Sequence, residues 1–254
     1  MIARRFAEQR LGVSQVPFVY QEDFSIMTST VIPMPAPVLL DVEGTFDKFP
    51  VRRVYCVGRN YADHAIEMGH DPSREAPFFF QKNADNAYNG EAFPYPPLSS
   101  NVHFEVELVM ALKAGGSGID AQDALDCVYG YGVGIDFTRR DLQDQMKKAG
   151  RSWEVAKAFE KSAPVSALVP VAKIGHPQEG PIWLEVNGAR KQNGDMNQMI
   201  WKLPEIIAEL SKQFELAAGD IIMTGTPAGV GAVVKGDKVV CEAQGVGRLE
   251  LTIV

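Results

Sequence analysis

Two glutamates in the stretch His103-Phe104-Glu105-Val106-Glu107-Leu108 are the first residues of this sequence that suggest chemistry. Polar and apolar residues alternate there, which is typical of a strand with one face on a core and the other on something polar. The Cα atoms of Glu105 and Glu107 would lie roughly 6.6 Å apart on the same face as His103. Two carboxylates this close are costly to bury unless a cation lies between them. The alternative is an exposed strand face with two solvated glutamates.

A second candidate group is the pair His64 and Glu67. Asn60 is a good cap for a helix that would run through Met68, and residues three apart on a helix share one face. A histidine held by a carboxylate is an arrangement typical of a general base, because the carboxylate fixes the ring tautomer. An ordinary surface His–Glu pair is the alternative.

The third group surrounds the segment 130–136, Gly-Tyr-Gly-Val-Gly-Ile-Asp. Alternation places Gly132 and Gly134 on the face that ends in Asp136, and glycines inside a strand indicate a close approach to the backbone. Thr138 could cap a helix over 139–149 that carries Arg140 and Gln143 on one side. Two lysines are further candidates. Lys82 closes the run Phe78-Phe79-Phe80-Gln81 and could point into a pocket or mark a solvated strand end, and Lys157 has small and apolar neighbours in Val155-Ala156-Lys157-Ala158.

Length and composition indicate an ordinary soluble protein. The 254 residues are 46% hydrophobic and 22% charged, and the net charge of −7 argues against a nucleic-acid partner. The three cysteines are far apart and form no Cys-x-x-Cys pair, which favours a reducing cytoplasm. No apolar run approaches the ~18 residues of a membrane span, and no secretory signal is present. Met27 is an alternative start, and we expect residues 1 to 30 to be poorly packed.

The pattern of elements predicts an α+β fold that is predominantly β. Short strands dominate, with few helices and no alternating strand–helix register, which disfavours a TIM barrel or a doubly wound sheet. We expect a rolled, mixed β-sandwich or barrel with peripheral helices. Residues 1–50 read as an N-terminal arm or small accessory segment, and 51–254 as the catalytic domain.

Several motifs in one order resemble the fumarylacetoacetate hydrolase family, and the resemblance spans Val51 to the C-terminus. Bacterial members that hydrolyse fumarylpyruvate or other acylpyruvates are the most similar. The motifs are Gly58-Arg59-Asn60-Tyr61-Ala62-Asp63-His64, Glu105-Val106-Glu107, Asp136 with Thr138-Arg139-Arg140-Asp141-Leu142-Gln143, Ala156-Lys157, and Thr224-Gly225-Thr226-Pro227-Ala228-Gly229-Val230-Gly231.

The resemblance implies a role for each candidate residue. Glu105, Glu107 and Asp136 would bind Mg²⁺, or Mn²⁺ as a substitute, because hard divalent ions prefer oxygen ligands. His64 and Glu67 would activate water on a lid segment, and Lys157 would stabilise an enolate. Substrate contacts would come from Arg59, Lys82, Arg140, Gln143 and Thr226, with His103 behind the metal ligands. A homodimer is the expected assembly.

The implied reaction is hydrolysis of a 2,4-diketo acid, such as fumarylpyruvate, to pyruvate and a carboxylic acid. Two alternatives use the same metal site, namely decarboxylation of oxaloacetate or a related diacid, and keto–enol isomerisation. Decarboxylation needs no activated water, so the His64–Glu67 pair favours hydrolysis. A non-catalytic metal-binding β module is the remaining interpretation.

Overall fold

The computed structural model describes residues 30–67 and 75–254. Contacts divide the chain into two units, Met1–Ala36 and Pro37–Val254. In the first unit only residues 30–36 are described, and they contain no helix or strand. The alternative start at Met27, the packing of residues 1–29 and the predicted helix end beyond Glu67 lie outside the described residues. All that follows concerns the second unit.

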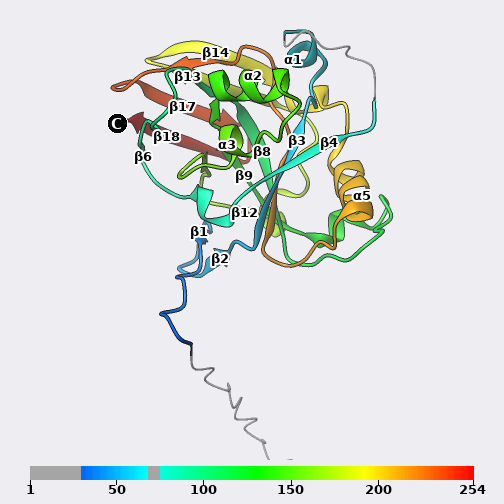
Figure 1. The fold of residues 1–254 in the computed structure, drawn as a ribbon. Helices are drawn as coiled ribbons and strands as arrows, with labels where there is room; N and C mark the ends of the chain where they lie inside the picture. The colour runs from blue at the N-terminus through cyan, green and yellow to red at the C-terminus, as the bar shows by residue number, and fades with distance from the viewer. Residues whose placement is uncertain (1–29, 68–74) are drawn as a thin grey trace, which may run out of the picture. The chain divides into compact units, whose positions relative to one another are not determined.

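The largest sheet has six strands in the order β12-β9-β8-β15-β3-β4 (Figure 1). Only the β15–β3 pair is parallel, so the sheet is mixed. Every residue of β8 and β15 is buried, as expected for central strands covered on both faces. The six strands are β3 (Arg53–Gly58), β4 (Phe78–Lys82), β8 (Val106–Leu112), β9 (Val128–Ile135), β12 (Val169–Pro170) and β15 (Asp220–Met223).

A five-stranded sheet, in the order β14-β13-β17-β18-β6, packs against β8 and β9 of the first. Along β18 the buried residues are Leu249, Leu251 and Ile253, the alternation of a strand with one inward face. One hydrophobic cluster joins both sheets, with Leu108 from the first and Leu251 from the second. The strands are β6 (Ala92–Phe93), β13 (Pro181–Val186), β14 (Ala189–Asp195), β17 (Lys238–Ala243) and β18 (Gly247–Ile253).

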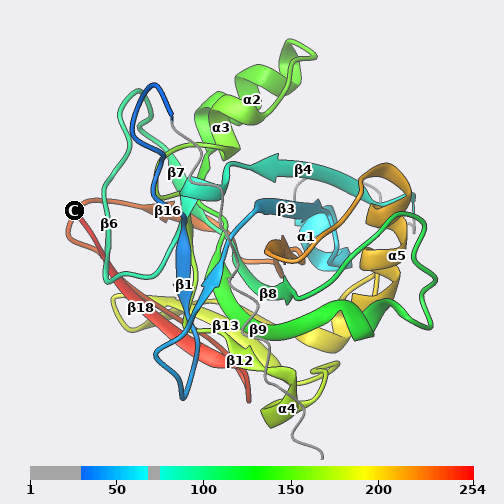
Figure 2. The ribbon, with the colours of Figure 1, turned by 90° about the horizontal axis from the view of Figure 1, so that it is seen from below.

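The predicted rolled, mixed sandwich with peripheral helices is therefore confirmed, and none of the sheets closes into a barrel within the described residues. Three small sheets complete it: β1 (Leu39–Asp41) with β2 (Lys48–Pro50), β5 (Ala87–Tyr88) with β11 (Ala163–Pro164), and β7 (Val102–Phe104) between β10 (Thr138–Arg139) and β16 (Gly231–Val233). The helices lie around the sheets (Figure 2): α1 (Ala62–Glu67), α2 (Arg140–Lys148), α3 (Glu154–Lys157), α4 (Val171–Ile174) and α5 (Leu203–Gln213). No helix within 30–67 or 75–254 is long and apolar enough to cross a membrane.

The β1–β2 hairpin lies before the predicted domain boundary at residue 50. Leu40 and Phe49 of this hairpin belong to a second hydrophobic cluster, together with Val54 and Ile221 of the six-stranded sheet. The division into an accessory segment and a catalytic domain stays a prediction.

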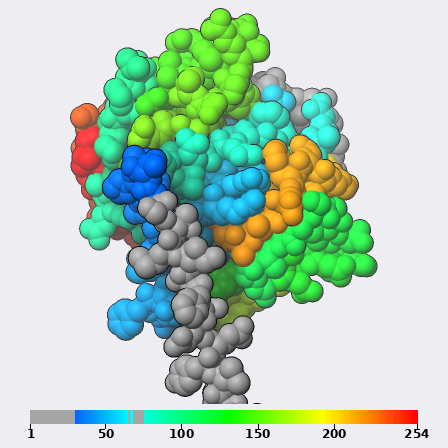
Figure 3. All heavy atoms as spheres, turned by 60° about the horizontal axis from the view of Figure 1, so that its bottom comes forward, coloured from blue at the N-terminus to red at the C-terminus, as the bar shows by residue number. Residues whose placement is uncertain are grey.

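Helix α5 is amphipathic, as its apolar spacing predicts, and buries Ile206, Ile207 and Leu210. Beside it runs the segment 113–127, which appears in bright green next to α5 in Figure 3. The backbone joins the two, since Gly118 N donates to Ser211 O at 2.9 Å. This edge of the sandwich lies away from the residues with candidate chemistry and serves packing.

The strand predicted over residues 103–110 is interrupted at Glu105, which corrects the sequence-based expectation. Residues before it form β7 in one sheet, and residues after it form β8 in another. The physical reason lies in the backbone. Val106 N donates to the Gln192 side chain at 2.9 Å rather than to a strand partner, and Glu105 O accepts from Asp136 N at 2.8 Å. Glu105 thus lies where the chain passes from one sheet to the next.

The glycines of β9 make room for protein rather than for a ligand. A Cβ on Gly130 would lie 2.5 Å from Val169 O, and one on Gly132 would lie 3.2 Å from the side chains of Leu168, Ser166 and Val165. The close approach inferred from the sequence is confirmed, but the approaching chain is the segment 164–170, which crosses β9.

Gly130→Ala should destabilise the protein by about 1–3 kcal/mol, because its Cβ would meet a backbone carbonyl that cannot move aside. Gly132→Ala is the matched control, since its Cβ meets side chains that have room to shift. Urea denaturation followed by tryptophan fluorescence measures both. Equal stability of the two variants would contradict this packing account.

Candidate metal and active site

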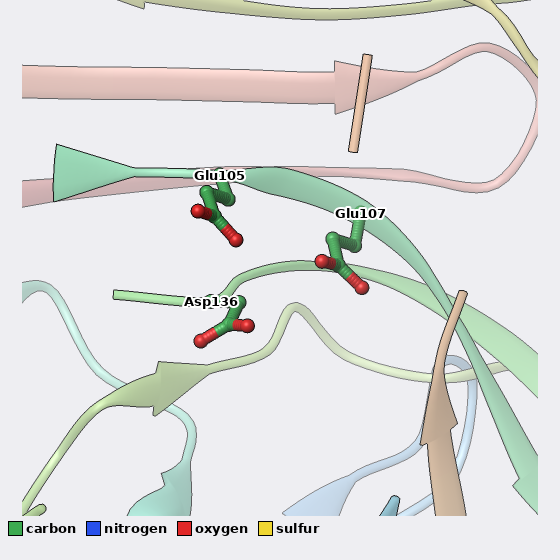
Figure 4. Close-up of side chains that lie close together, drawn as sticks. All are labelled: Glu105, Glu107 and Asp136. Carbon is green, nitrogen blue, oxygen red and sulfur yellow. The ribbon is translucent and has the colours of Figure 1, made fainter. Parts of the chain in front are cut away.

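Three buried carboxylates meet between β7, β8 and the end of β9. Figure 4 shows Glu105, Glu107 and Asp136 with their carboxylates turned toward one another. One ligand oxygen from each residue lies within 4.8 Å of the others. Their relative exposures are 5%, 2% and 0%, so water does not screen their mutual repulsion. The alternative of a solvated acidic face is excluded for these side chains.

Cations surround two of the three acids. Lys157 Nζ lies 2.8 Å from Glu105 Oε2 and 2.7 Å from Asp136 Oδ2. Arg140 also pairs with Glu105. Lys82 Nζ lies 2.8 Å from Asp136 Oδ1. Phe137 O, Lys157 O and Ser162 Oγ surround the same ammonium and accept its hydrogen bonds.

The charges set the protonation of this cluster. Burial alone would raise the pKa of Glu105, but the nearby cations of Lys157 and Arg140 outweigh it and hold that pKa well below its usual range. Burial would lower the pKa of Lys157, yet the charges of Asp136 and Glu105 raise it instead. The Lys157 ammonium is therefore charged at neutral pH.

Glu107 is the acid without a cation. Among the described residues its carboxylate forms no ion pair and accepts one hydrogen bond, from Gly225 N at 2.7 Å. Burial, followed by the charges of Asp136 and Glu105, raises the pKa of Glu107 well above its ordinary value. Among the described residues, no cation therefore lies beside the buried Glu107 carboxylate to balance its charge.

This unmet charge is the observation that fits a divalent cation. The trio offers only hard carboxylate oxygens, which is the ligand chemistry of Mg²⁺ and Mn²⁺. A doubly charged ion would relieve the repulsion that keeps Glu107 protonated. The residues present therefore fit such a metal.

His64 and Glu67 are brought together at the same place by the short helix α1. His64 Nδ1 lies 3.1 Å from Glu67 Oε2, and the His64 side chain is 9% exposed. Glu67 also accepts from Gly229 N at 3.1 Å, which fastens α1 to the loop after β15. His64 lines the cavity over the three carboxylates. Glu67 is not part of the described lining and contacts His64 from outside it.

The cavity over the trio has a volume of about 40 Å³ and brings most of the predicted substrate contacts together. Helix α2 places Arg140 and Gln143 on one face, and Arg140 Nη1 donates to Gln143 Oε1 at 2.6 Å. The lining includes Arg59, Glu105, Glu107, Asp136, His64, Arg140, Gln143, Lys157 and Thr226.

A larger cavity of about 590 Å³ adjoins this one. Phe80, Trp153 and Lys157 line both cavities, so the acid site shares a wall with it. Phe78, Phe80 and Trp153 pack against one another there, with Phe78 and Trp153 ring centroids 5.0 Å apart. The larger space offers both aromatic and polar side chains next to the charged site.

Lys82 is the predicted substrate contact that the structure places elsewhere. It is 2% exposed and absent from the described lining of the cavity. An ammonium has three protons, and those of Lys82 are directed at the three oxygens named above. We infer a positioning role for Lys82, beneath Asp136 and the backbone of Lys157. His103, expected behind the ligands, hydrogen-bonds to Asn101 Oδ1 at 2.9 Å, and burial lowers its pKa to about 4.

Arg59 reaches the cavity through an unusual backbone. Its φ of 59° lies in the left-handed region, which is costly for a residue with a side chain. The following Asn60 is fully buried, and its amide donates to Thr224 O at 2.8 Å while accepting from Trp201 N at 2.7 Å. Asn60 therefore clamps this turn to the loop after β15 instead of capping α1 as expected.

Sequence reasoning missed two contributors. Trp153 lines both cavities. In the sequence only its aromatic character hinted at a contact with the aromatic run Phe78–Phe80, which is weak evidence for a place in the site. Gln192 hydrogen-bonds to the backbone between the two glutamates from 86 positions away. No local pattern could reveal a contact of that kind.

Comparison with known proteins shows the family of this chain. The family model described as fumarylacetoacetate (FAA) hydrolase C-terminal matches residues 53–254. The chain belongs to the fumarylacetoacetate hydrolase family, as its motifs predict. A fumarylpyruvate hydrolase from Ralstonia sp. is 41% identical over 184 residues, which cover 72% of this chain and 95% of that protein.

Two further relatives differ in the activity that they are named for. A mitochondrial oxaloacetate tautomerase of Rattus norvegicus is 42% identical over 202 residues, 80% of this chain and 91% of the relative. The crystal structure of fumarylpyruvate hydrolase from Pseudomonas aeruginosa, in complex with Mn²⁺ and pyruvate, is 46% identical with a TM-score of 0.87. That match covers 89% of this chain and 99% of the solved chain. The family is that of hydrolases and tautomerases.

The stability of the metal-free protein should fall as the pH rises above the ordinary carboxyl pKa of 4.5. Between that value and the raised pKa of Glu107 the folded protein holds a proton that the unfolded chain has lost, so raising the pH favours unfolding. Added Mn²⁺ replaces this proton and should raise the Tm more at pH 8 than at pH 6.

Differential scanning fluorimetry at the two pH values, with and without Mn²⁺, measures this effect. Glu107→Gln is the control, because a neutral amide cannot titrate and should flatten the pH dependence of the metal-free protein. The same pH slope in both proteins would contradict the assignment of the titration to Glu107.

Proposed function

We propose that the protein hydrolyses acylpyruvates, the 2,4-diketo acids, of which fumarylpyruvate is the leading candidate. One observation carries the proposal: His64, held by Glu67, lines the same small cavity as the three carboxylates and Lys157. Hydrolysis needs an activated water beside the groups that bind a 2-oxo acid, and this cavity offers a base for it. The fumarylpyruvate hydrolases among the relatives support the choice of substrate.

His64 would be the general base. The Nδ1–H group of His64 would donate a hydrogen bond to Glu67. This tautomer leaves a lone pair on Nε2, which can take a proton from water. The water, deprotonated by His64, would attack the 4-carbonyl of the diketo acid. The C3–C4 bond would then break, with its electron pair forming the enolate of pyruvate, and C3 would take up the proton held by His64 to give pyruvate. A positioned base contributes typically ~10²- to 10⁴-fold to the rate.

Glu105, Glu107 and Asp136 would hold Mg²⁺, with Mn²⁺ as a substitute. When bound, the ion would act as a Lewis acid and a template for the 2-oxo acid. Arg140, paired with Glu105 and hydrogen-bonded to Gln143, keeps one ligand carboxylate in place while facing the cavity. Arg59 and Thr226 complete the wall on the side of α1.

Lys157 would stabilise the negative charge that develops on the departing pyruvate. Two of its ammonium protons are directed at Glu105 and Asp136. The described residues offer no acceptor for the third, which can therefore point into the cavity that Lys157 lines. This free proton distinguishes Lys157 from Lys82. Loss of Lys157 would remove both the enolate partner and a charge that balances the trio.

Oxaloacetate tautomerisation is the second candidate, because relatives named for that reaction are as similar as the hydrolases. It uses the same 2-oxo acid and needs proton transfer at C3 but no attack by water. Decarboxylation of oxaloacetate needs neither activated water nor His64. The three reactions therefore differ in their demand on the His64–Glu67 pair.

Magnesium as the physiological ion, a homodimer and a cytoplasmic location belong to the same proposal. The three cysteines are free thiols, which is consistent with a reducing compartment. No charge pattern calls for nucleic acid as a partner.

His64→Ala should lower the kcat for acylpyruvate hydrolysis by about 10²- to 10⁴-fold. The Mn²⁺ dissociation constant should stay near that of the wild type, because His64 contacts none of the carboxylate ligands. Glu67→Gln should give a smaller loss, since the amide can still contact Nδ1 but no longer stabilises the imidazolium. Enol absorbance and calorimetric metal titration provide the two readouts. Wild-type turnover by His64→Ala would exclude the dyad.

A panel of fumarylpyruvate, acetylpyruvate and oxaloacetate should separate the candidate reactions. We expect pyruvate and a carboxylic acid from the diketo acids with Mg²⁺ or Mn²⁺, and no turnover in the presence of a chelator. Proton NMR identifies the products, and CO₂ release reports decarboxylation. Rapid enol–keto exchange of oxaloacetate without cleavage of any acylpyruvate would overturn the hydrolase in favour of the tautomerase.

A further inference from the structure

Strand β14 carries a buried polar side chain that no family motif includes. Of its seven residues, Ala189–Asp195, only Gln192 is buried, and its relative exposure is 0%. A buried amide is costly unless all its hydrogen-bonding groups have partners. The partners of Gln192 therefore show what this side chain holds in place.

The carbonyl end of Gln192 holds the strand that carries the candidate metal ligands. Gln192 Oε1 accepts from Val106 N at 2.9 Å. Val106 lies between Glu105 and Glu107, at the break between β7 and β8 where the amide has no strand partner. One side chain thus fixes the backbone between the two glutamates.

The amino end of Gln192 holds the loop that follows β15. Gln192 Nε2 donates to Thr226 Oγ1 at 2.7 Å and to Pro227 O at 2.8 Å. The loop also approaches the strand backbone closely, since a Cβ on Gly229 would lie 2.2 Å from Lys191 O. Gly229 N in turn contacts Glu67 of the candidate dyad.

The direction of the Thr226 hydrogen bond has a chemical consequence. Because Thr226 Oγ1 accepts from Gln192, its own proton must point elsewhere, and within the described residues it has no protein acceptor. Thr226 is 3% exposed and lines the cavity above the trio. Its hydroxyl proton is therefore available to an acceptor in the cavity.

We propose that Gln192 is a positioning residue that orients the Thr226 hydroxyl as a hydrogen-bond donor to a bound 2-oxo acid and fixes the Glu105–Glu107 backbone with the same amide. The inference rests on the proposed function only in placing a 2-oxo acid in this cavity. Its role is indirect, since Gln192 itself does not line the cavity.

The variant Gln192→Glu tests the roles of the two ends of the amide separately. The carboxyl group can still accept from Val106 N. As a carboxylate it cannot donate, and if burial keeps it protonated it has one proton for the two acceptors that the amide served, so the Thr226 hydroxyl is released to donate to it. We expect the dissociation constant of pyruvate for the Mn²⁺-loaded protein to rise roughly ten- to a hundred-fold, with Mn²⁺ affinity not weakened. Gln192→Met removes both ends and should weaken Mn²⁺ and pyruvate binding together.

Thr226→Val provides the second arm. Removing the hydroxyl should weaken pyruvate binding as much as Gln192→Glu does, and the double variant should be little worse than either single one. Gln244→Glu, the same change at an exposed turn, is the matched control and should bind both ligands as the wild type does. Isothermal titration of Mn²⁺, then of pyruvate into the Mn²⁺-loaded protein, measures every variant without turnover.

Three outcomes would overturn the inference. Unchanged pyruvate affinity in Gln192→Glu or Thr226→Val would show that the hydroxyl is not used. If Mn²⁺ affinity fell together with pyruvate affinity in Gln192→Glu, the role of Gln192 would be to support the strand in general and not to orient the Thr226 hydroxyl. Equal effects of Gln192→Glu with and without the Thr226 hydroxyl would assign the loss to the added charge.

Pyruvate binding also keeps this test separate from that of the proposed function. A protein that binds pyruvate under Gln192 control but cleaves no acylpyruvate would overturn the hydrolase and leave the positioning role intact. If acylpyruvates are cleaved, Gln192→Glu should raise KM with little change in kcat. A wild-type protein that binds no pyruvate with Mn²⁺ would overturn both proposals.

Discussion

Repulsion among three buried carboxylates is the constraint on which this site depends. Glu105, Glu107 and Asp136 lie within reach of one ion and almost out of contact with water. Among the described residues, Lys157, Arg140 and Lys82 form ion pairs with Glu105 and Asp136, whereas Glu107 has a backbone N–H as its one hydrogen-bond partner. Removing one partner of such a buried cluster leaves an uncompensated charge, which is far more costly than losing a surface ion pair. The surrounding fold must therefore hold cations, strands and loop in fixed relation.

The surroundings of Lys82 and Lys157 give these two similar residues different roles. Lys82 and Lys157 are both buried beside Asp136, and each follows apolar residues in the sequence. Lys82 directs its protons at Phe137 O, Lys157 O and Ser162 Oγ, whereas Lys157 keeps one for the cavity. The count of available protons, rather than charge or burial, separates the group that supports the site from the group that can touch a substrate.

Local periodicity was sufficient to predict much of the molecule. Alternation identified the inward faces of strands, and three-residue spacing placed His64 with Glu67 and Arg140 with Gln143, all of which the structure brings to one cavity or its edge. The same alternation failed at Glu105, because it assumes one continuous strand. It indicated a close approach to the β9 glycines but could not identify the segment 164–170 as the approaching chain. Contacts made across sheets leave no periodic trace in the sequence.

Asn60 and Gln192 extend this point to the function of polar residues in the core. Asn60 reads as a helix cap, and Gln192 lies in an otherwise unremarkable edge strand, yet both are 0% exposed and hydrogen-bonded to the loop after β15. The two amides fix Thr224 and Thr226, and Gly225 between these residues donates to Glu107. A shift of this loop would change the candidate metal ligand Glu107 and the lining of the cavity at once. The two amides therefore couple acid placement to substrate placement, so substitutions at either position should affect both kinds of binding unless, as in Gln192→Glu, one end of the amide is preserved.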